Sequence, residues 1–405
     1  MNVRRSAAVL AAVAVIGAAA PAAADSSPSA SPPALPTALY GDSDPQYDGV
    51  WRQSLALLAQ HTAGAEPPKA AVDWLTGQQC ADGSFAPYRA DTSKACDDTT
   101  TVDTNQTAAA VQALAALGGH DAVTDKAVAW LKSVQNKDGG WGYTAGGASD
   151  TNSTSVVVGA LAAAGEKPAE VTKDGKSAHD ALLELELGCE ADGAGAFAFQ
   201  PDKKGELLAN ADATAAGILG SLGAGLAAGP GETATAGTAC EEADSPEQAA
   251  ANGAAYLTDA LAGSGHLVSS LPGAEDQPDY GNTADAVVAL AAQGSTGQAG
   301  KAAAWLEKNA TGWAAQSGPA AYAQLIFAAH ATGTDPRAFG GTDLVERLAA
   351  TGPAPEKATG AAESEEEKKD DSGPGSGVWW LVGVCLIAGT GLGFLLRGRA
   401  KKRQP

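Results

Sequence analysis

Basic side chains are scarce in this chain, and their scarcity limits the partners that it can have. The sequence holds 26 Lys and Arg residues against 47 Asp and Glu residues. All of the acidic residues and 19 of the basic ones fall between residues 25 and 377, which gives that segment a net charge of −28. Nucleic acids and other polyanions are attracted by basic surfaces. We therefore expect no nucleic acid partner, and we interpret the acidity as that of a solvated surface.

Histidine and cysteine are also scarce. The five histidines are scattered, and none lies near a cysteine at the spacing typical of metal ligands. The sequence therefore predicts no metal site, and we expect no cofactor. Four cysteines fall in the acidic segment, and an even number in an oxidising compartment favours disulfides. Three pairings are possible, of which we favour Cys80 with Cys96 and Cys189 with Cys240, because Cys80 and Cys189 follow corresponding helical segments at the same distance.

Apolar runs of the kind that enter membranes occur near the two ends. Two arginines, an apolar stretch and an alanine triplet before Asp25 are typical of a secretory signal peptide, which we predict over residues 1–24. The uncharged run 378–396 is long enough for one transmembrane helix, and the basic tail 397–405 should stay in the cytoplasm. We therefore expect a single-pass protein of the cell membrane with its main domain outside, and we expect its source to be a high-GC Gram-positive bacterium.

Between a Ser/Pro-rich linker at 25–40 and a charged Pro/Gly linker at 351–377, the chain repeats a pair of helices six times. Six apolar segments each end in glycine, which is typical of a helix C-terminus. They alternate with six more charged segments that also have helical character. Repeated helix pairs stack to bury a common core, so residues 41–350 are predicted to form an all-α (α/α)6 toroid with the apolar helices inside. The apolar segments are residues 53–64, 107–118, 154–165, 214–225, 283–294 and 322–333.

A second repeated pattern follows the charged helices. It reads W-L-x(3)-Q-x(2)-D-G-G-W/F in residues 130–141 and is echoed in residues 74–85. This pattern resembles the repeats of squalene cyclases and of protein prenyltransferase β-subunits. The toroid of that superfamily also occurs in thioester domains of complement-like proteins and in cobalamin carriers of the transcobalamin and intrinsic factor family. The resemblance therefore implies the fold more strongly than the function.

The resemblance can be tested on the motifs that the enzymes use. The sequence contains no D-x-D-D acid of the cyclases, no Asp-x-Cys pair of the prenyltransferase zinc site and no G-C-G-E-Q thioester. The chain is therefore closest in character to the non-catalytic transcobalamin-like members, and we lean against an enzyme. This implies a membrane-anchored toroid that captures cobalamin or another bulky hydrophobic ligand for uptake. Those carriers have a second, small β-domain that this chain lacks, so a partner protein would supply it and a membrane transporter would receive the ligand.

Two other functions stay open at this point. One is a divergent enzyme, either a cyclase or prenyltransferase acting on isoprenoids or a glycan-active hydrolase. Hydrolysis of a glycan needs two carboxylates that face each other across the site, and Asp103 and Asp150 are the pair that we would assign. The other is a structural scaffold for protein interactions, which a filled toroid centre would favour.

The candidate ligand site follows from the direction of the inner helices, which should all begin around one mouth of the toroid. Asp or Asn before each apolar segment is the usual helix N-cap, so a purely structural role is the alternative for each of them. Large aromatic residues after the Asp-Gly turns can likewise be packing residues. Convergent polar groups beside aromatic side chains nevertheless favour a small-molecule site. The residues predicted to bind the ligand are Asp103, Asn105, Trp141, Tyr143, Asp150, Asn152, Tyr280 and Asn282.

Overall fold

The computed structural model describes residues 35–232, 240–269 and 276–353. The predicted signal peptide, membrane helix and basic tail (1–24, 378–396 and 397–405) lie outside the described residues, as does most of both linkers. Within the described part of the chain, no helix is both long enough and apolar enough to cross a membrane.

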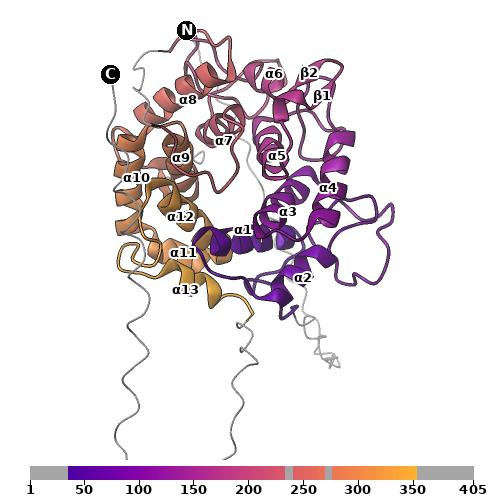
Figure 1. Cartoon of the computed structure of the whole chain (residues 1–405). Coiled ribbons are helices and arrows are strands. Elements are labelled where there is room, and N and C mark those ends of the chain that lie inside the picture. The colour runs from indigo at the N-terminus through magenta and orange to yellow at the C-terminus, as the bar shows by residue number, and fades with distance from the viewer. Residues whose placement is uncertain (1–34, 233–239, 270–275, 354–405) are drawn as a thin grey trace, which may run out of the picture. The chain divides into compact units, whose positions relative to one another are not determined.

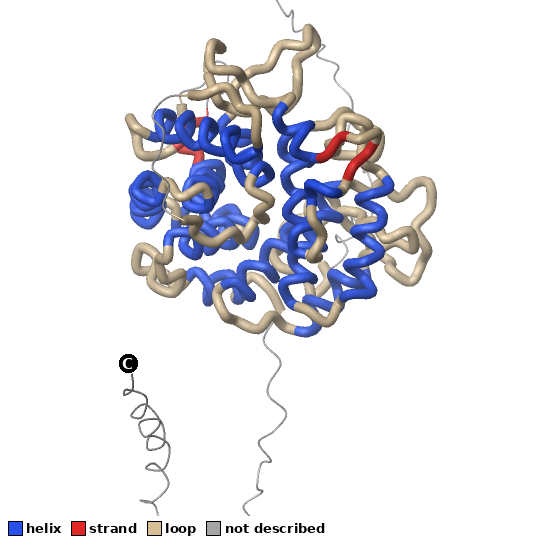
Figure 2. Tube along the Cα trace, turned by 45° about the horizontal axis from the view of Figure 1, so that its top comes forward, coloured by secondary structure: helices blue, strands red, loops and turns tan. Residues whose placement is uncertain are grey.

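Six helices form a closed inner ring in the described residues (Figures 1 and 2). Each packs against the inner helix before it and the one after it, and the last packs against the first. The predicted arrangement of apolar helices inside is therefore confirmed. The ring consists of α1 (Gly49–Thr62), α3 (Thr104–Leu117), α5 (Thr151–Ala163), α7 (Ala211–Ser221), α9 (Tyr280–Ala292) and α12 (Pro319–Thr332).

The outer helices cover this ring, one after each inner helix, and a short extra helix follows the fifth outer one. The described residues also contain a single 3-10 turn and two small antiparallel hairpins, so the fold is mainly helical rather than wholly so. The outer helices are α2 (Lys69–Gly77), α4 (Asp121–Ser133), α6 (Ala178–Leu183), α8 (Pro246–Leu261), α10 (Thr296–Asn309) and α13 (Leu344–Ala349), and the other elements are α11 (Thr311–Ser317), η1 (Pro168–Glu170), β1 (Thr172–Lys173), β2 (Lys176–Ser177), β3 (Leu267–Ser269) and β4 (Gln277–Asp279).

The two rings differ because their sequences differ in polarity around the helix. Helix α1 is buried from Gly49 to Gln60 except at Trp51, which is partly buried. Helix α4 buries one stripe, including Trp130 and Leu131, and exposes Asp125 on the other side. A helix that is apolar all round needs protein on every side, whereas an amphipathic helix covers a core. The sequence therefore assigns each helix to its ring.

The glycines predicted to end the inner helices do so in five of the six repeats. Gly64, Gly118, Gly165, Gly294 and Gly333 all have positive φ angles between 69° and 93°, a conformation that glycine adopts at low cost. The fourth repeat differs: α7 ends at Ser221, and the positive φ occurs at Gly223 instead of Gly225. The segment that follows α7 packs inside the ring, where Gly225 lies close to Gln112 and Gly159.

A repeated threonine fixes the loop that enters each of four inner helices. The Thr154 hydroxyl accepts a hydrogen bond from the backbone N–H of Trp141 at 3.0 Å, at the end of the Asp-Gly turn. Because this backbone group is buried, it needs a partner inside the protein. Equivalent hydrogen bonds join Phe85 to Thr107, Phe197 to Thr214 and Leu267 to Thr283 at 2.9 to 3.0 Å. The bond therefore holds each loop against the first turn of the next inner helix.

The glutamine and glycine of the repeated motif are structural as well. The Gln135 side chain donates to the carbonyls of Gly139 and Val171, which ties the turn to the next repeat. Gly139 has a φ of 89°, and a Cβ there would overlap the carbonyl of Ser177. The Gln79 amide makes the same pair of bonds one repeat earlier. The motif thus specifies packing between repeats.

Both favoured disulfide pairings are confirmed. Cys80 is bonded to Cys96, and Cys189 is bonded to Cys240. Each bridge holds the chain that follows an outer helix.

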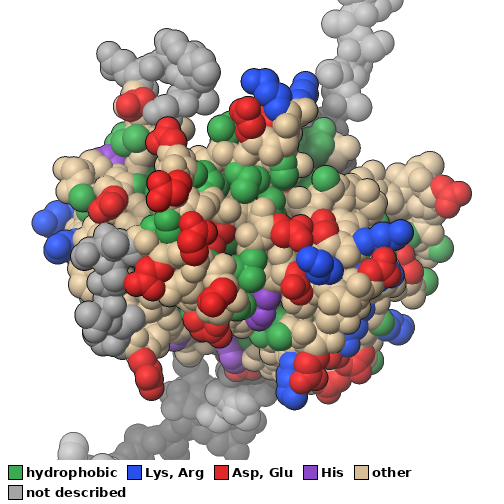
Figure 3. Space-filling view, turned by 90° about the horizontal axis from the view of Figure 1, so that it is seen from above, with side chains coloured by type: hydrophobic (Ala, Val, Ile, Leu, Met, Phe, Trp, Pro, Cys, Tyr) green, Lys and Arg blue, Asp and Glu red, His purple; other side chains and the backbone are tan. Residues whose placement is uncertain are grey.

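The surface of the ring is acidic, as the composition predicts. Figure 3 shows Asp and Glu side chains spread over one face, where Lys and Arg are fewer. Several of the lysines pair with exposed carboxylates, for example Lys132 with Glu166 at 2.6 Å. Exposed pairs of this kind contribute about 1 kcal/mol or less.

Candidate functional site

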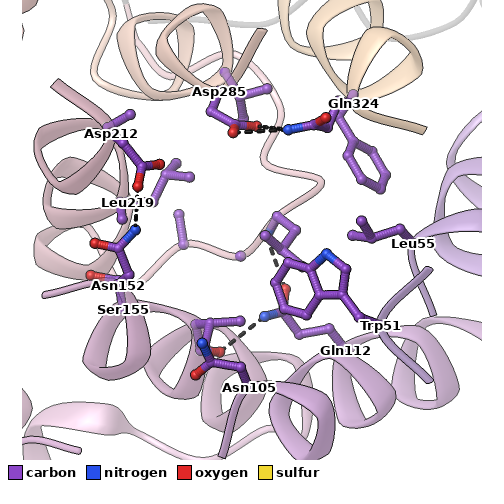
Figure 4. Close-up of a pocket in the computed structure, with 18 of the residues that line it drawn as sticks. Trp51, Leu55, Asn105, Gln112, Asn152, Ser155, Asp212, Leu219, Asp285 and Gln324 are labelled. Carbon is purple, nitrogen blue, oxygen red and sulfur yellow. Dashed lines mark hydrogen bonds between the residues drawn. The ribbon is translucent and has the colours of Figure 1, made fainter. Parts of the chain in front are cut away.

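A cavity of about 270 Å³ lies inside the ring, and all six inner helices contribute to its wall (Figure 4). Its apolar residues outnumber its polar ones. The polar lining side chains are Asn105, Gln112, Asn152, Ser155, Asp212, Asp285 and Gln324, and the apolar lining includes Trp51, Leu55, Val156, Leu219, Leu226, Val288 and Phe327. The centre of the toroid is thus a hollow with a mixed wall.

The helix starts explain which residues face this hollow. Asp103, Asp150 and Asn210 cap α3, α5 and α7, and in each case the second residue after the cap lines the cavity. These second residues are Asn105, Asn152 and Asp212. In α9 and α12, the sixth residue after the cap lines the cavity instead. These residues are Asp285 in α9 and Gln324 in α12. The second and sixth positions lie one helical turn apart, on the same face of the helix.

The chain after α7 covers the far end of the cavity. Ala224, Gly225 and Leu226 belong to the cavity wall. The Leu226 N–H donates to Oε1 of Gln112 at 2.8 Å, while Nε2 of Gln112 donates to the carbonyl of Val156 at 3.0 Å. A Cβ on Gly225 would overlap the Gln112 amide oxygen, which would have to shift and give up its hydrogen bond to Leu226. This end of the lumen is therefore formed by backbone and apolar side chains.

Two carboxylates face the cavity from neighbouring helices. Asp212 on α7 accepts a hydrogen bond from Nδ2 of Asn152 at 2.8 Å, and Asp285 on α9 accepts from Nε2 of Gln324 at 3.0 and 3.2 Å. Figure 4 shows Asp285 beside Gln324 and Asp212 beside Asn152 around the central space. Each acid thus receives hydrogen bonds from one amide side chain. For Asp212 this amide comes from α5, and for Asp285 it comes from α12.

Burial of these carboxylates raises the pKa of both. The pKa of Asp285 rises from 3.8 to about 7, first because the group is removed from water and then because of the negative charge of Asp212; the Gln324 hydrogen bond opposes this. Burial also raises the pKa of Asp212, and the charge of Asp279 adds to the effect. None of the described residues that line the cavity is Lys, Arg or His. The lumen therefore carries acid without a basic counterpart.

Three further oxygens of the wall have no hydrogen-bond partner within the described protein. They are Oδ1 of Asn105, Oδ1 of Asn152 and Oγ of Ser155. Ser155 is only 4% exposed. A buried polar atom without a partner is costly, and a ligand group is one way of satisfying it.

Asp103 and Asp150 lie at helix starts and do not line this cavity. Asp103 is buried and accepts from the Gln106 N–H at 2.8 Å; Asp150 is buried and accepts from the Ser153 N–H at 2.7 Å. Burial raises the pKa of Asp103 to about 6 and also raises the pKa of Asp150. Both side chains therefore act as N-caps here, and their role in catalysis stays a prediction.

The six other residues predicted to bind ligand divide into two groups. Asn105 and Asn152 line the cavity. Trp141 is fully buried and donates its indole N–H to Leu131, and Tyr143 is 49% exposed and donates its hydroxyl to Asp103 at 3.2 Å. The Tyr280 ring stacks on Trp305 and Trp313, while the Asn282 amide donates to its own cap Asp279. The structure thus brings two of the eight predicted residues together in the lumen.

Sequence reasoning did not find Asp212, Asp285, Gln112, Gln324 or Ser155. All of them lie inside helices that are apolar around the full circumference, and such a helix gives no amphipathic face that points to a lumen. A usable signal was nevertheless there. A polar residue at the second, fifth, sixth or ninth position after a cap interrupts an otherwise apolar run.

Three comparisons with known proteins bear on this geometry. Residues 51–185 match the family model of the prenyltransferase alpha-alpha toroid domain. A search of curated proteins finds no match. Among solved structures, ent-copalyl diphosphate synthase from Streptomyces platensis matches with 15% identity and a TM-score of 0.45, over 70% of this chain and 50% of the synthase. A protein from Actinoplanes matches with 16% identity and a TM-score of 0.47, over 73% of this chain and 93% of the other.

The family match confirms the predicted resemblance at the level of the fold. Residues 51–185, which span the first three helix pairs, match that toroid domain, and the described residues together form an α/α toroid. The chain spans only half the length of the copalyl diphosphate synthase.

Proposed function

We propose that this chain, an α/α toroid of the squalene cyclase and prenyltransferase type, binds one small and mainly apolar molecule in its lumen. The observation that carries the proposal is the cavity of about 270 Å³ surrounded by all six inner helices, apolar over most of its wall and with polar side chains from five of these helices. Binding sites for small molecules have this composition. A structural scaffold has no need of such a hollow.

The size of the lumen restricts the ligand. A water-sized group occupies about 30 Å³, so 270 Å³ has room for about nine such groups. Pockets that enclose drug-sized molecules measure about 300–1,000 Å³. A corrinoid is larger than this lumen and would have to rest against the toroid rather than within it. We therefore propose a smaller ligand than cobalamin, and no comparison points to a corrinoid.

The chemistry of the wall also restricts the ligand. Prenyl diphosphates carry several negative charges, and phosphate groups are bound by basic side chains, helix N-termini or metal ions. The lining residues include two acids and no basic side chain. We therefore propose a ligand without a phosphate group. A sugar, with hydroxyls over its whole surface, also fits poorly against the apolar side of the lumen.

We also propose that the toroid lies outside the cell membrane and acts with partner proteins. A signal peptide at 1–24 and a membrane helix at 378–396 would hold the toroid outside the cell membrane. There the bound molecule could be passed to a membrane transporter, with or without a small β-domain partner.

Native mass spectrometry of the full chain, purified without added ligand, tests this function. We expect a bound molecule of low mass that organic solvent extracts. Ala216→Trp places an indole in the lumen and should abolish this extra mass, because Ala216 lines the cavity. Ala122→Trp, at an exposed position of α4, is the matched control and should retain it. Retention of the same molecule by Ala216→Trp would show that the lumen is not the site.

A second candidate is a proton-transfer enzyme acting on an isoprenoid, and the raised pKa of Asp285 favours it specifically. An acid that is half protonated near neutral pH and faces an apolar cavity can donate a proton to a bound substrate. For this function, Asp285→Asn should abolish turnover of an isoprenoid substrate while Asp150→Asn, which keeps its cap, should not. Product analysis by gas chromatography after incubation with uncharged isoprenoids separates the two candidates.

A further inference from the structure

We infer that the molecule bound in the lumen carries a protonated amine at its polar end, and that Asp212 and Asp285 recognise this group. The inference rests on the proposed function and narrows it from any small apolar ligand to an organic cation. Three features of the lumen lead to it: its charge, its unpartnered acceptor oxygens and its shape.

The charge of the lumen is negative on one side only. Asp212 and Asp285 come from adjacent helices and influence each other electrostatically. Each receives hydrogen bonds from one neutral amide, whereas a carboxylate offers about four lone-pair sites. Neutral amides do not cancel the charge, and an uncompensated carboxylate is expensive away from water. A cation in the lumen would supply the missing charge.

The unpartnered atoms of the wall are all able to accept a hydrogen bond. Asn105 and Asn152 each present an unpartnered Oδ1, and the buried Ser155 presents an unpartnered Oγ. An ammonium group has three N–H donors and no acceptor. It can therefore bond to a carboxylate and to these oxygens at once. A ligand with a carboxylate or phosphate end would be repelled by both acids.

A metal ion is the other source of positive charge. The described residues contain no group of three or more His, Cys, Asp or Glu side chains that could hold one. The acids instead stand at the edge of an apolar wall that includes Leu55, Leu219 and Val288. This pairing of a charged end with an apolar space fits an alkyl amine of about nine heavy atoms.

The test compares three probes of equal chain length with the full chain at pH 7.5. Octylammonium is protonated at this pH, n-octanol is neutral and octanoate is negative. By isothermal titration calorimetry, we expect the amine to bind at least tenfold more tightly than the alcohol, a difference of about 1.4 kcal/mol. Octanoate should bind most weakly. This comparison needs no variant.

Variants then assign the preference to the two acids. Asp212→Asn and Asp285→Asn keep the shape and an acceptor oxygen, so each should reduce the preference for amine over alcohol by about tenfold while leaving the affinity for octanol within about threefold. Asp125→Asn removes an exposed carboxylate of α4 and should leave the preference intact. Equal affinities of the amine and the alcohol would overturn the inference but leave a lumen that binds apolar molecules. If none of the three probes binds, the proposed function fails as well.

Discussion

Replacing Asp285 by Asn should stabilise the empty protein, and the gain should grow with pH. The pKa of this carboxyl is about 7 in the folded chain and 3.8 in its ordinary state. As the pH rises from 5 to 7, the unfolded chain has already lost this proton while the folded chain still holds it. The folded state therefore binds more protons than the unfolded state, and its stability falls as pH rises.

The size of this loss in stability follows from the pH range over which the folded and unfolded states differ by one proton. Each pH unit in which the two states differ by one proton changes the unfolding free energy by about 1.4 kcal/mol. Between pH 5 and pH 7, the unfolding free energy of the wild-type chain therefore falls by about 3 kcal/mol. Above the folded pKa, both states have lost the proton and the unfolding free energy stops falling. Asn carries no charge and can still accept the hydrogen bond from Gln324. For a folded unit of about 320 residues, 3 kcal/mol corresponds to a difference in Tm of about 4 °C.

Thermal unfolding followed by circular dichroism at pH 5, 6, 7 and 8 measures this effect. The Tm of Asp285→Asn minus that of the wild type should increase by about 4 °C between pH 5 and pH 8. Asp125→Asn, which removes an exposed charge, controls for the change in net charge. A difference that is the same at every pH, or a variant that is less stable at pH 8, would refute the claim that Asp285 is buried without compensation.

Two further predictions concern the repeat itself. Gly139→Ala should cost about 3 kcal/mol or more in urea denaturation, because its positive φ and the overlap with Ser177 add together, while Gly146→Ala, which also has a positive φ but open space around it, should cost about 1 kcal/mol. Equal losses would mean that contact between repeats contributes nothing there. Thr154→Val should cost about 1–3 kcal/mol, since it leaves the buried N–H of Trp141 without its acceptor, and Thr154→Ser should recover most of this loss. Hydrogen exchange at the Trp141 amide gives an independent measure.

The ring could be predicted from the sequence because every level of the pattern agrees. The apolar segments have no polar face, the charged segments have one, and glycine ends five of the six inner helices as expected. The disulfides were predictable because Cys80 and Cys189 occupy equivalent places in two repeats. The exception was Gly225, which belongs to the cavity wall and lies against Gln112 instead of ending a helix. Sequence alone does not distinguish these two reasons for a glycine.

The lumen was less predictable, for a physical reason. Asp103 and Asp150 stand in the most polar part of the repeat, yet their side chains point back to their own helix starts. The helix begins at the cap, and its turn decides which of the following residues faces the cavity. The first residue to do so is the second one after the cap. Asn105 and Asn152 met this condition, and Asp212 would have been found by the same count in the third copy of the pattern.

The unpartnered atoms of the lumen wall support the proposal that the lumen binds a ligand. Seven buried side-chain atoms in the described residues have no hydrogen-bond partner, and five of them belong to the first two turns of α3 and α5. Elsewhere the same repeats satisfy their loops through threonine and glutamine. Each unpartnered atom costs about 1–3 kcal/mol, and the acids of α7 and α9 add to this. Three of the five, in Asn105, Asn152 and Ser155, line the cavity, and the cation that we propose would give these three oxygens a donor.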